Sequence, residues 1–299
     1  MAVRRHGRGS VTVAAVVSLA VMWAGGCSGA GDDDGFPGAP GTGSGVPTGT
    51  TAGRGRPAET AGTGARALAE IRGAADTLVA AGSARTRTAM ETAAGGTRVT
   101  IRGHGGYDFR RRTGQLTVVL PQTPAGADDR RPVTELLTAG ALYMKNRGAG
   151  VPADKWVRVD TATLADGNLV TGGATDPLAA AELLRGVREL VAVGTEDLGG
   201  VRVRHYRGSV DIARAARLAG PYARAALAAA VKGFTTDVVP FDVLLDDEGR
   251  LRKVSYRFTF THRGATAPVT SVTELFAFGT PVVVRLPDRR DIYTGRIRG

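Results

Sequence analysis

The sequence predicts an α+β domain built on one large antiparallel sheet. The clearest evidence is the stretch 238–260 (VVPFDVLLDDEGRLRKVSYRFTF), whose second half places apolar residues at every other position. One side of such a repeat is buried and the other faces water. The polar connection Asp246-Asp247-Glu248-Gly249 separates the halves and ends in a residue that tolerates positive φ, which is typical of a hairpin turn. The apolar side of this hairpin comprises Phe241, Val243, Leu245, Val254, Tyr256, Phe258 and Phe260.

Two further observations support this class. Strand-like alternation recurs on both sides of the hairpin, and the helical patterns are inserted between groups of strands instead of following each strand in turn. That order is typical of an antiparallel α+β fold. The further segments expected to be strands are 99–102, 107–110, 116–120, 133–137, 141–145, 156–160, 187–193, 201–206, 268–278 and 281–286.

Four helices are expected. The first has its apolar face on Leu68, Ile71, Ala75, Leu78 and Val79 and stops at Gly82. The second begins with Asp176 as N-cap and Pro177 at the first helical position. Two Ala-rich helices, 212–219 and 221–232, are divided at Gly220-Pro221.

Residues 1–27 have the features of an export signal. Arg4, Arg5 and Arg8 precede the apolar run 11–22, and small residues then lead to Cys27, the single cysteine of the chain. The run is shorter than the roughly 20 residues that span a bilayer. The site resembles the bacterial lipobox, whose cysteine receives a diacylglyceryl group, although Ala24 stands where that pattern prefers Leu. An ordinary secretory signal with a stray cysteine is the alternative, and the sequence leaves the Sec or Tat route open.

A tether is expected over residues 28–65, ahead of a folded domain over 66–299. Residues 28–64 contain 12 Gly and 4 Pro, a composition that cannot bury enough apolar surface to offset the entropy of ordering. A flexible chain of this length spans roughly 33 Å root-mean-square, enough to hold a domain clear of a membrane.

The net charge of +11 does not indicate nucleic-acid binding here. Only 4 of the 39 basic residues are Lys, an Arg bias that suits a GC-rich genome, and loss of the three leader arginines lowers the charge to +8 (11 − 3). Attraction to an anionic membrane surface is the use that we expect for this charge, if it has one.

The residues do not predict an enzyme, a metal site or a cofactor. Outside the leader the chain has three histidines and neither G-x-S-x-G nor a metal-spaced cluster. His205 lies in an alternating strand and is expected to be structural or solvated. Asp246-Asp247-Glu248 lacks the spacing of a calcium loop, so a turn is expected. For Arg110-Arg111-Arg112 a solvated turn is expected, with contact to anionic lipid headgroups as the alternative.

Four stretches together resemble one known family. They are GYDFRRRTGQLTVVL (106–120), VRHYRGSVDIARA (203–215), FDVLLDDEGRLRKVSY (241–256) and FAFGTPVVVRLP (276–287). With the lipobox and tether before them, they resemble the actinobacterial LppX/LprG/LprF-type lipoproteins, which are related in fold to the LolA and LolB carriers. The resemblance covers about residues 66–290.

This resemblance implies a strongly curved antiparallel half-barrel with helices packed on its concave face. An apolar cavity between sheet and helices would receive the acyl chains of lipids or glycolipids, such as palmitate. Ala-rich helices such as 223–230 would cover the sheet without filling the space. The residues expected to line the cavity are Phe109, Leu116, Val118, Val243, Leu245, Val254, Tyr256, Phe258, Phe260, Phe276 and Phe278. The alternative for these aromatic side chains is an ordinary closed core.

The expected function is that of a lipoprotein held at the extracytoplasmic face of the cell membrane by acylated Cys27. It would bind lipid or glycolipid for transport or presentation, with a membrane transporter or signalling protein as a further partner. The alternative is an envelope sensor or interaction module of LolA-like fold that signals to a membrane partner. A structural cell-wall protein and an enzyme are more distant alternatives.

Overall fold

A computed structural model describes residues 57–94, 97–120, 132–148, 150–170, 175–262 and 265–295. Cys27 and most of the expected tether lie outside these residues. Five α-helices and eleven strands are found in this part of the chain. The α+β class is therefore confirmed.

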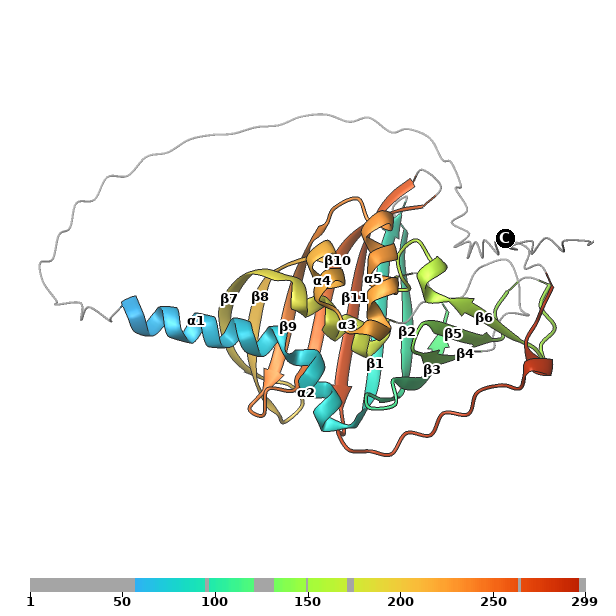
Figure 1. The fold of residues 1–299 in the computed structure, drawn as a ribbon, viewed down its shortest axis with the longest axis horizontal. Coiled ribbons are helices and arrows are strands. Elements are labelled where there is room, and N and C mark those ends of the chain that lie inside the picture. The colour runs from blue at the N-terminus through green and yellow to red at the C-terminus, as the bar shows by residue number, and fades with distance from the viewer. Residues whose placement is uncertain are drawn as a thin grey trace, which may run out of the picture.

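The strands form one sheet in which every neighbouring pair is antiparallel. The strand order is β6-β5-β4-β3-β2-β1-β11-β10-β9-β8-β7, and its two ends are not joined, so the sheet is curved but open (Figure 1). Consecutive strands pair within β1–β6 and within β7–β11, and the pairing of β1 with β11 joins these two halves, so that β6 and β7 are the edge strands. The strands are β1 Ser83–Ala94, β2 Thr97–Asp108, β3 Thr113–Val119, β4 Val133–Thr138, β5 Ala141–Lys145, β6 Trp156–Asp160, β7 Val187–Asp197, β8 Arg202–Asp211, β9 Val238–Asp246, β10 Leu251–His262 and β11 Ala265–Phe276.

The β9–β10 hairpin forms as the alternation predicts. Val254 pairs with Val243 and Tyr256 with Phe241, which places these four side chains on one face. The turn is held by Asp246, whose carboxylate accepts hydrogen bonds from the backbone N–H groups of Glu248 and Arg250 and from the Arg250 side chain. Gly249 has a φ of 75°, the conformation expected at the end of this turn.

The helices cover one face of the sheet, which we call the inner face (Figure 1). Tyr256 identifies that face, because its hydroxyl donates to the backbone oxygen of Ala180 in α3. The inserted helices begin where capping predicts: Asp176 accepts from Leu178 and Ala179 N–H, and Asp211 accepts from Arg214 N–H. The helices are α1 Pro57–Arg72, α2 Ala74–Ala81, α3 Pro177–Leu183, α4 Ile212–Leu218 and α5 Pro221–Gly233, and the 3₁₀ turns are Thr161–Thr163, Leu184–Gly186 and Arg289–Asp291.

The first helical region departs from the prediction in two ways. Helix α1 begins at Pro57, so the last part of the expected tether is helical and not extended chain. Proline at the first helical turn, followed by Ala and Glu, favours this start. The single helix expected up to Gly82 is divided at Gly73, which separates α1 from α2, and Gly82 ends α2 with a φ of 90°.

Two strand expectations also need correction. The segment 281–286 is not a strand; after Gly279 the chain leaves the sheet and returns only at Tyr293, whose N–H donates to Trp156 O at the edge strand β6. Prolines at 281 and 287 remove donors that a strand would need. Strand β1 was not predicted, because its alternation is between Thr and Arg and not between apolar and polar residues.

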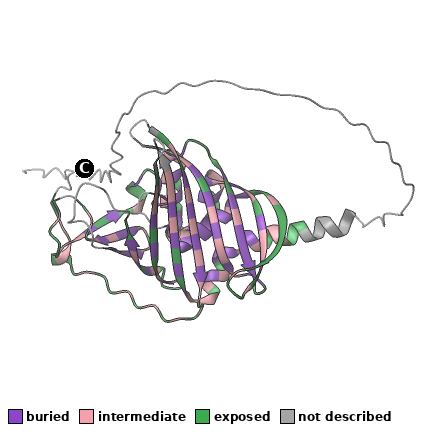
Figure 2. Cartoon of the chain, turned by 180° about the vertical axis from the view of Figure 1, so that it is seen from behind, coloured by how far each residue is buried: buried purple, intermediate pink, exposed green. Residues whose placement is uncertain are grey.

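The core lies between the inner face and the helices. Along β3 buried residues alternate with more exposed ones, and the same striping is visible across the strands from behind (Figure 2). Tyr256 and Phe258 are 1% exposed and Phe241 is fully buried. Burial of each such side chain stabilises the fold by about 1.5–3 kcal/mol.

Candidate functional site

The inner face gathers most of the residues expected to contact lipid. Those on β3, β9 and β10 and the one directly after β2 are all 0–1% exposed. They are Phe109, Leu116, Val118, Val243, Leu245, Val254, Tyr256 and Phe258. Phe258 stacks on Phe234, with ring centroids 4.7 Å apart, directly after α5. These side chains belong to one hydrophobic core cluster between sheet and helices.

Phe276 projects away from the inner face, and Phe278 lies beyond the end of β11. On β11 the buried positions are Val269, Ser271, Thr273 and Leu275, so Phe276 projects from the outer face. There the Arg87 guanidinium lies 4.4 Å from its ring centroid. A two-residue alternation that begins at Phe276 would place this aromatic residue on the inner face. The register of β11 differs from that by one residue, which exchanges the two faces of the strand.

Phe278 follows the end of β11, after Ala277 with a φ of 49°. It is partly buried at the rim of the core, with the guanidinium carbons of Arg250 and Arg252 at 4.7 Å and 5.5 Å from its ring centroid. The side chain of Phe260 is outside the described part of the structure.

Three side-chain hydrogen bonds join the start of α3 to the inner face. They involve Thr175, the N-cap Asp176 and Ala180. The Thr175 and Ser271 hydroxyls lie 2.7 Å apart, Tyr107 Oη donates to Asp176 Oδ2 over 3.1 Å, and Tyr256 Oη donates to Ala180 O over 2.7 Å. Burial raises the pKa of both tyrosines well above the usual range, so both remain donors. The helical cover is therefore anchored to β2, β10 and β11.

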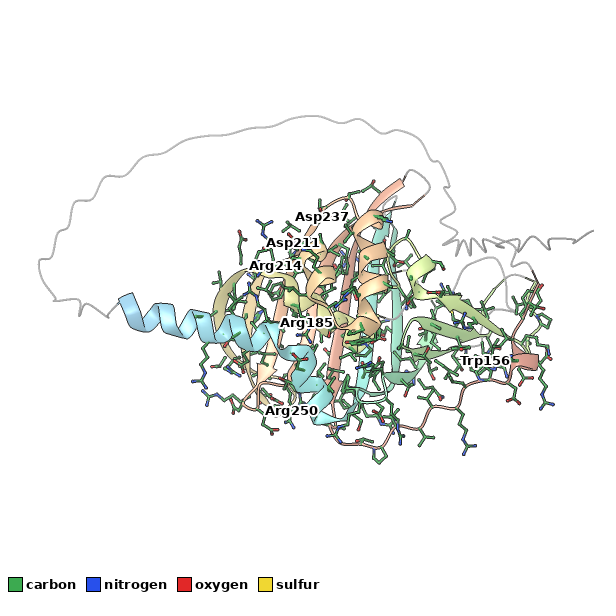
Figure 3. The ribbon with its side chains drawn as sticks, viewed as in Figure 1. Trp156, Arg185, Asp211, Arg214, Asp237 and Arg250 are labelled. Carbon is green, nitrogen blue, oxygen red and sulfur yellow. The ribbon has the colours of Figure 1, made fainter. Side chains whose placement is uncertain are left out.

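A second set of contacts joins the helices to one another. Arg185, labelled in Figure 3, donates to both oxygens of Asp76 in α2 at 2.7 Å and 3.0 Å, and to both oxygens of Glu182 in α3. Glu182 also accepts from the N–H of Gly220, between α4 and α5. The hydrogen bond from Arg185 lowers the pKa of Asp76. We call Arg185, Asp76 and Glu182 the helix clamp.

Three buried polar side chains on β1 and β4 differ from these. Thr86 and Glu135 are 0% exposed and Thr88 is 5% exposed. Their side-chain oxygens have no hydrogen-bond partner among the described residues. Glu135 forms an ion pair with Arg147, whose Nη1 lies 4.0 Å from Oε1. Burial raises the pKa of Glu135 to about 8, and Arg147 partly opposes that shift.

Sequence reasoning missed these three residues. The signal for Thr86 and Thr88 was their alternation with Arg85 and Arg87, a β-branched residue at every second position. Nothing in the sequence says that the threonine side is buried, since threonine is compatible with either face. Glu135 lies inside an expected strand as an isolated acid, and only the register of β4 shows that it points inward.

The other residues that were considered for chemistry have structural partners. His205 Nε2 lies 3.0 Å from Asp242 Oδ1, and Arg207 and Arg257 contact the same carboxylate. Arg110 donates to the backbone oxygens of Val79 and Ala80 at the end of α2.

Arg112 lies over the Tyr222 ring at 4.8 Å, with a φ of 56° at the turn. Among the described residues, no group of three or more His, Cys, Asp or Glu could hold a metal ion. None of the described helices is long and apolar enough to cross a membrane.

Comparisons with known proteins gave structural matches. No protein-family model matches the chain, and no curated protein matches it. The lipoprotein LppX of Mycobacterium tuberculosis is 14% identical with a TM-score of 0.46, over 74% of this chain and 99% of that one. LprF from Mycobacterium bovis is 12% identical with a TM-score of 0.40, over 75% of this chain and 97% of that one.

An outer membrane lipoprotein-sorting protein domain from Vibrio parahaemolyticus is 11% identical with a TM-score of 0.30, over 72% of this chain and 93% of that one. LppX and LprF are members of the group that the sequence motifs resemble. At these identities the likeness concerns the fold.

Proposed function

We propose that this protein is a lipoprotein of the cell envelope that binds the acyl chains of a lipid or glycolipid between the inner face and its helices. The leader and lipobox (1–27), the tether (28–65, with helix α1 starting inside it) and the binding domain (66–299) are parts of this proposal. Acylated Cys27 would hold the domain at the extracytoplasmic face of the membrane. The bound lipid would be carried or presented to a membrane partner, without catalysis.

The observation that carries the proposal is the breadth of the apolar inner face and the kind of residue that covers it. The buried side chains of the helices include small ones, Ala180, Ala181, Ala215, Ala223 and Ala230, each at most 3% exposed, beside larger ones such as Leu178, Leu183, Ile212 and Leu227. An acyl chain of about 16 carbons costs roughly 12 kcal/mol to expose to water, at about 0.8 kcal/mol per methylene. A carrier must enclose such a chain, and a broad apolar inner face covered by helices that carry alanines among larger side chains is suited to do so.

A matched pair of substitutions on β3 tests the proposal. Val118 is fully buried on the inner face beside Gly103, whereas its neighbour Val119 is 49% exposed on the outer face. Val118→Phe is expected to lower the capacity for a fluorescent fatty acid at least fivefold and to leave the thermal unfolding temperature almost unchanged, because the ring takes the place of bound chain.

Val119→Phe is the control and is expected to bind as wild type does. The measurement is fluorescence titration, together with mass spectrometry of lipids extracted from gently purified protein. A closed core would behave differently: Val118→Phe would then be destabilising by about 1–3 kcal/mol through overpacking, and wild type would bind no fatty acid. That pair of results would overturn the proposal.

A further inference from the structure

The unpartnered polar side chains of the inner face lie in two adjacent rows of the sheet. Thr86 on β1 is opposite Gly105, Gly105 is opposite Leu116, and Leu116 is opposite Glu135. Directly opposite residues in antiparallel strands point to the same face, so Thr86 and Glu135 both face the helices, three strands apart and about 14 Å from each other. Thr88 lies two residues after Thr86 on β1 and faces the helices as well. It belongs to the adjacent row of residues across the sheet, opposite Gly103 on β2 and Thr273 on β11.

On β2, the positions beside the two threonines carry no large side chain. Both β2 residues opposite them are glycines, 103 and 105. Thr86 and Thr88 therefore have no side chain beside them on β2, although the backbone of Gln115 in β3 occupies the side-chain position of Gly105 and Leu275 lies opposite Thr86 on β11. Leu116 is the one large side chain between Thr86 and Glu135 in their row.

Other buried polar groups between the sheet and the helices have hydrogen-bond partners within the protein. Ser271 meets Thr175, Tyr256 meets the α3 backbone, and Glu182 binds Arg185 and Gly220 N–H. Buried polar groups in native proteins are almost always paired in this way. Thr86, Thr88 and Glu135 have no such hydrogen bond from the described residues, although Arg147 lies 4.0 Å from Glu135, so a molecule that enters the interior could supply the missing bonds.

We propose that Thr86, Thr88 and Glu135 form a polar track inside the apolar interior that hydrogen-bonds oxygen atoms of the bound lipid. This inference rests on the proposed function. The track selects lipids that carry hydroxyl or ester oxygens along the chain over plain saturated chains. A threonine hydroxyl both donates and accepts, and a carboxyl that is protonated donates to a carbonyl or hydroxyl oxygen.

The test compares two probes on the full-length protein after removal of bound lipid: octadecanoic acid and 12-hydroxyoctadecanoic acid. Wild type is expected to bind the hydroxylated acid about five- to tenfold more tightly, the gain of one to two net hydrogen bonds. In Thr86→Val/Thr88→Val the ratio is expected to fall to about 1, with the affinity for octadecanoic acid unchanged, and Glu135→Leu is expected to reduce the ratio as well. Thr117→Val, on the outer face of β3, is the control and keeps the wild-type ratio.

Stability without ligand gives an independent measurement. Valine has nearly the shape of threonine, and replacing a hydroxyl that has no partner does not cost stability. The double valine variant is therefore expected to unfold at the wild-type temperature or above it. A lower temperature would show that the hydroxyls bond within the protein and would overturn the polar track.

The binding outcomes separate the two proposals. Equal affinity of wild type for both acids, or a ratio that survives the double substitution, overturns the polar track and leaves the proposed function standing. Failure of wild type to bind either acid overturns both.

Discussion

Among single residues, Glu135 is a carboxyl whose charge state depends on the fold. Its carboxyl is fully buried on β4, and burial raises its pKa from the usual 4.5 to about 8. A carboxyl with a raised folded-state pKa holds its proton more tightly in the folded protein than in the unfolded chain. Its contribution to stability is therefore complete below about pH 4.5 and is lost as the pH rises through about 8.

Glu135→Gln measures this effect, because glutamine keeps the shape of the protonated acid and does not titrate. The free energy of unfolding of the variant minus that of wild type is expected to rise by roughly 2–5 kcal/mol between about pH 5 and about pH 9. Urea unfolding at several pH values gives this difference directly. A difference that stays constant over the range would show that Glu135 is ionised in the folded protein at neutral pH.

Among the secondary-structure elements, the helices that cover the sheet are connected to one another by the helix clamp. Arg185 follows α3 and joins it to α2 through Asp76, while Glu182 reaches the start of α5 through Gly220. The Glu182 side chain is 2% exposed and the Arg185 side chain 19% exposed, so the pair is shielded from solvent screening. The clamp therefore joins α2, α3 and the start of α5 to one another.

Arg185→Met tests the clamp. The substitution leaves Glu182 buried without its cation, and a loss of roughly 3 kcal/mol in the free energy of unfolding is expected. Arg207→Met is the matched control: Arg207 also donates to a carboxylate, Asp242, but its side chain is 60% exposed. An exposed pair of this kind contributes about 1 kcal/mol or less. Equal losses in the two variants would rule out the clamp as a special contact.

For the molecule as a whole, the proposed lipid anchor on Cys27 would determine whether the protein stays attached to the membrane or is released from it. Two acyl chains on Cys27 would each contribute about 0.8 kcal/mol per buried methylene, enough together for lasting attachment. Cys27→Ser removes the thiol that attacks the diacylglyceryl donor, and a hydroxyl is a far poorer nucleophile because it stays protonated. Cys27 lies outside the described residues, and the fold of the domain is expected to be unchanged by the substitution.

Metabolic labelling with an alkyne fatty acid, followed by membrane fractionation, reads the anchor directly. Wild type is expected to take the label and to partition with membranes. Cys27→Ser is expected to remain an unprocessed precursor or to appear as soluble, unlabelled protein. A wild type that is already soluble and unlabelled would make Cys27 a stray cysteine.

The sequence by itself determined the class of the fold and the ends of several elements. The alternation around Tyr256 and Phe258 requires one apolar face whatever the strand pairs with, and Asp176 with Pro177 starts a helix through local hydrogen bonds and a fixed φ. These features depend on neighbours in the chain, so they can be read from the chain. The α+β class and the hairpin followed from them.

Only the tertiary structure decided which face each strand turns inward and which polar groups are left without partners. The pairing of Thr86 with Leu275 fixes the phase of β11, which places Leu275 inside and Phe276 outside, although both residue types are usually buried. The same pairings turn Thr88 and Glu135 toward the helices. The physical reason is that register between strands distant in sequence is set by the packing of the whole sheet, and a shift of one residue exchanges its two faces.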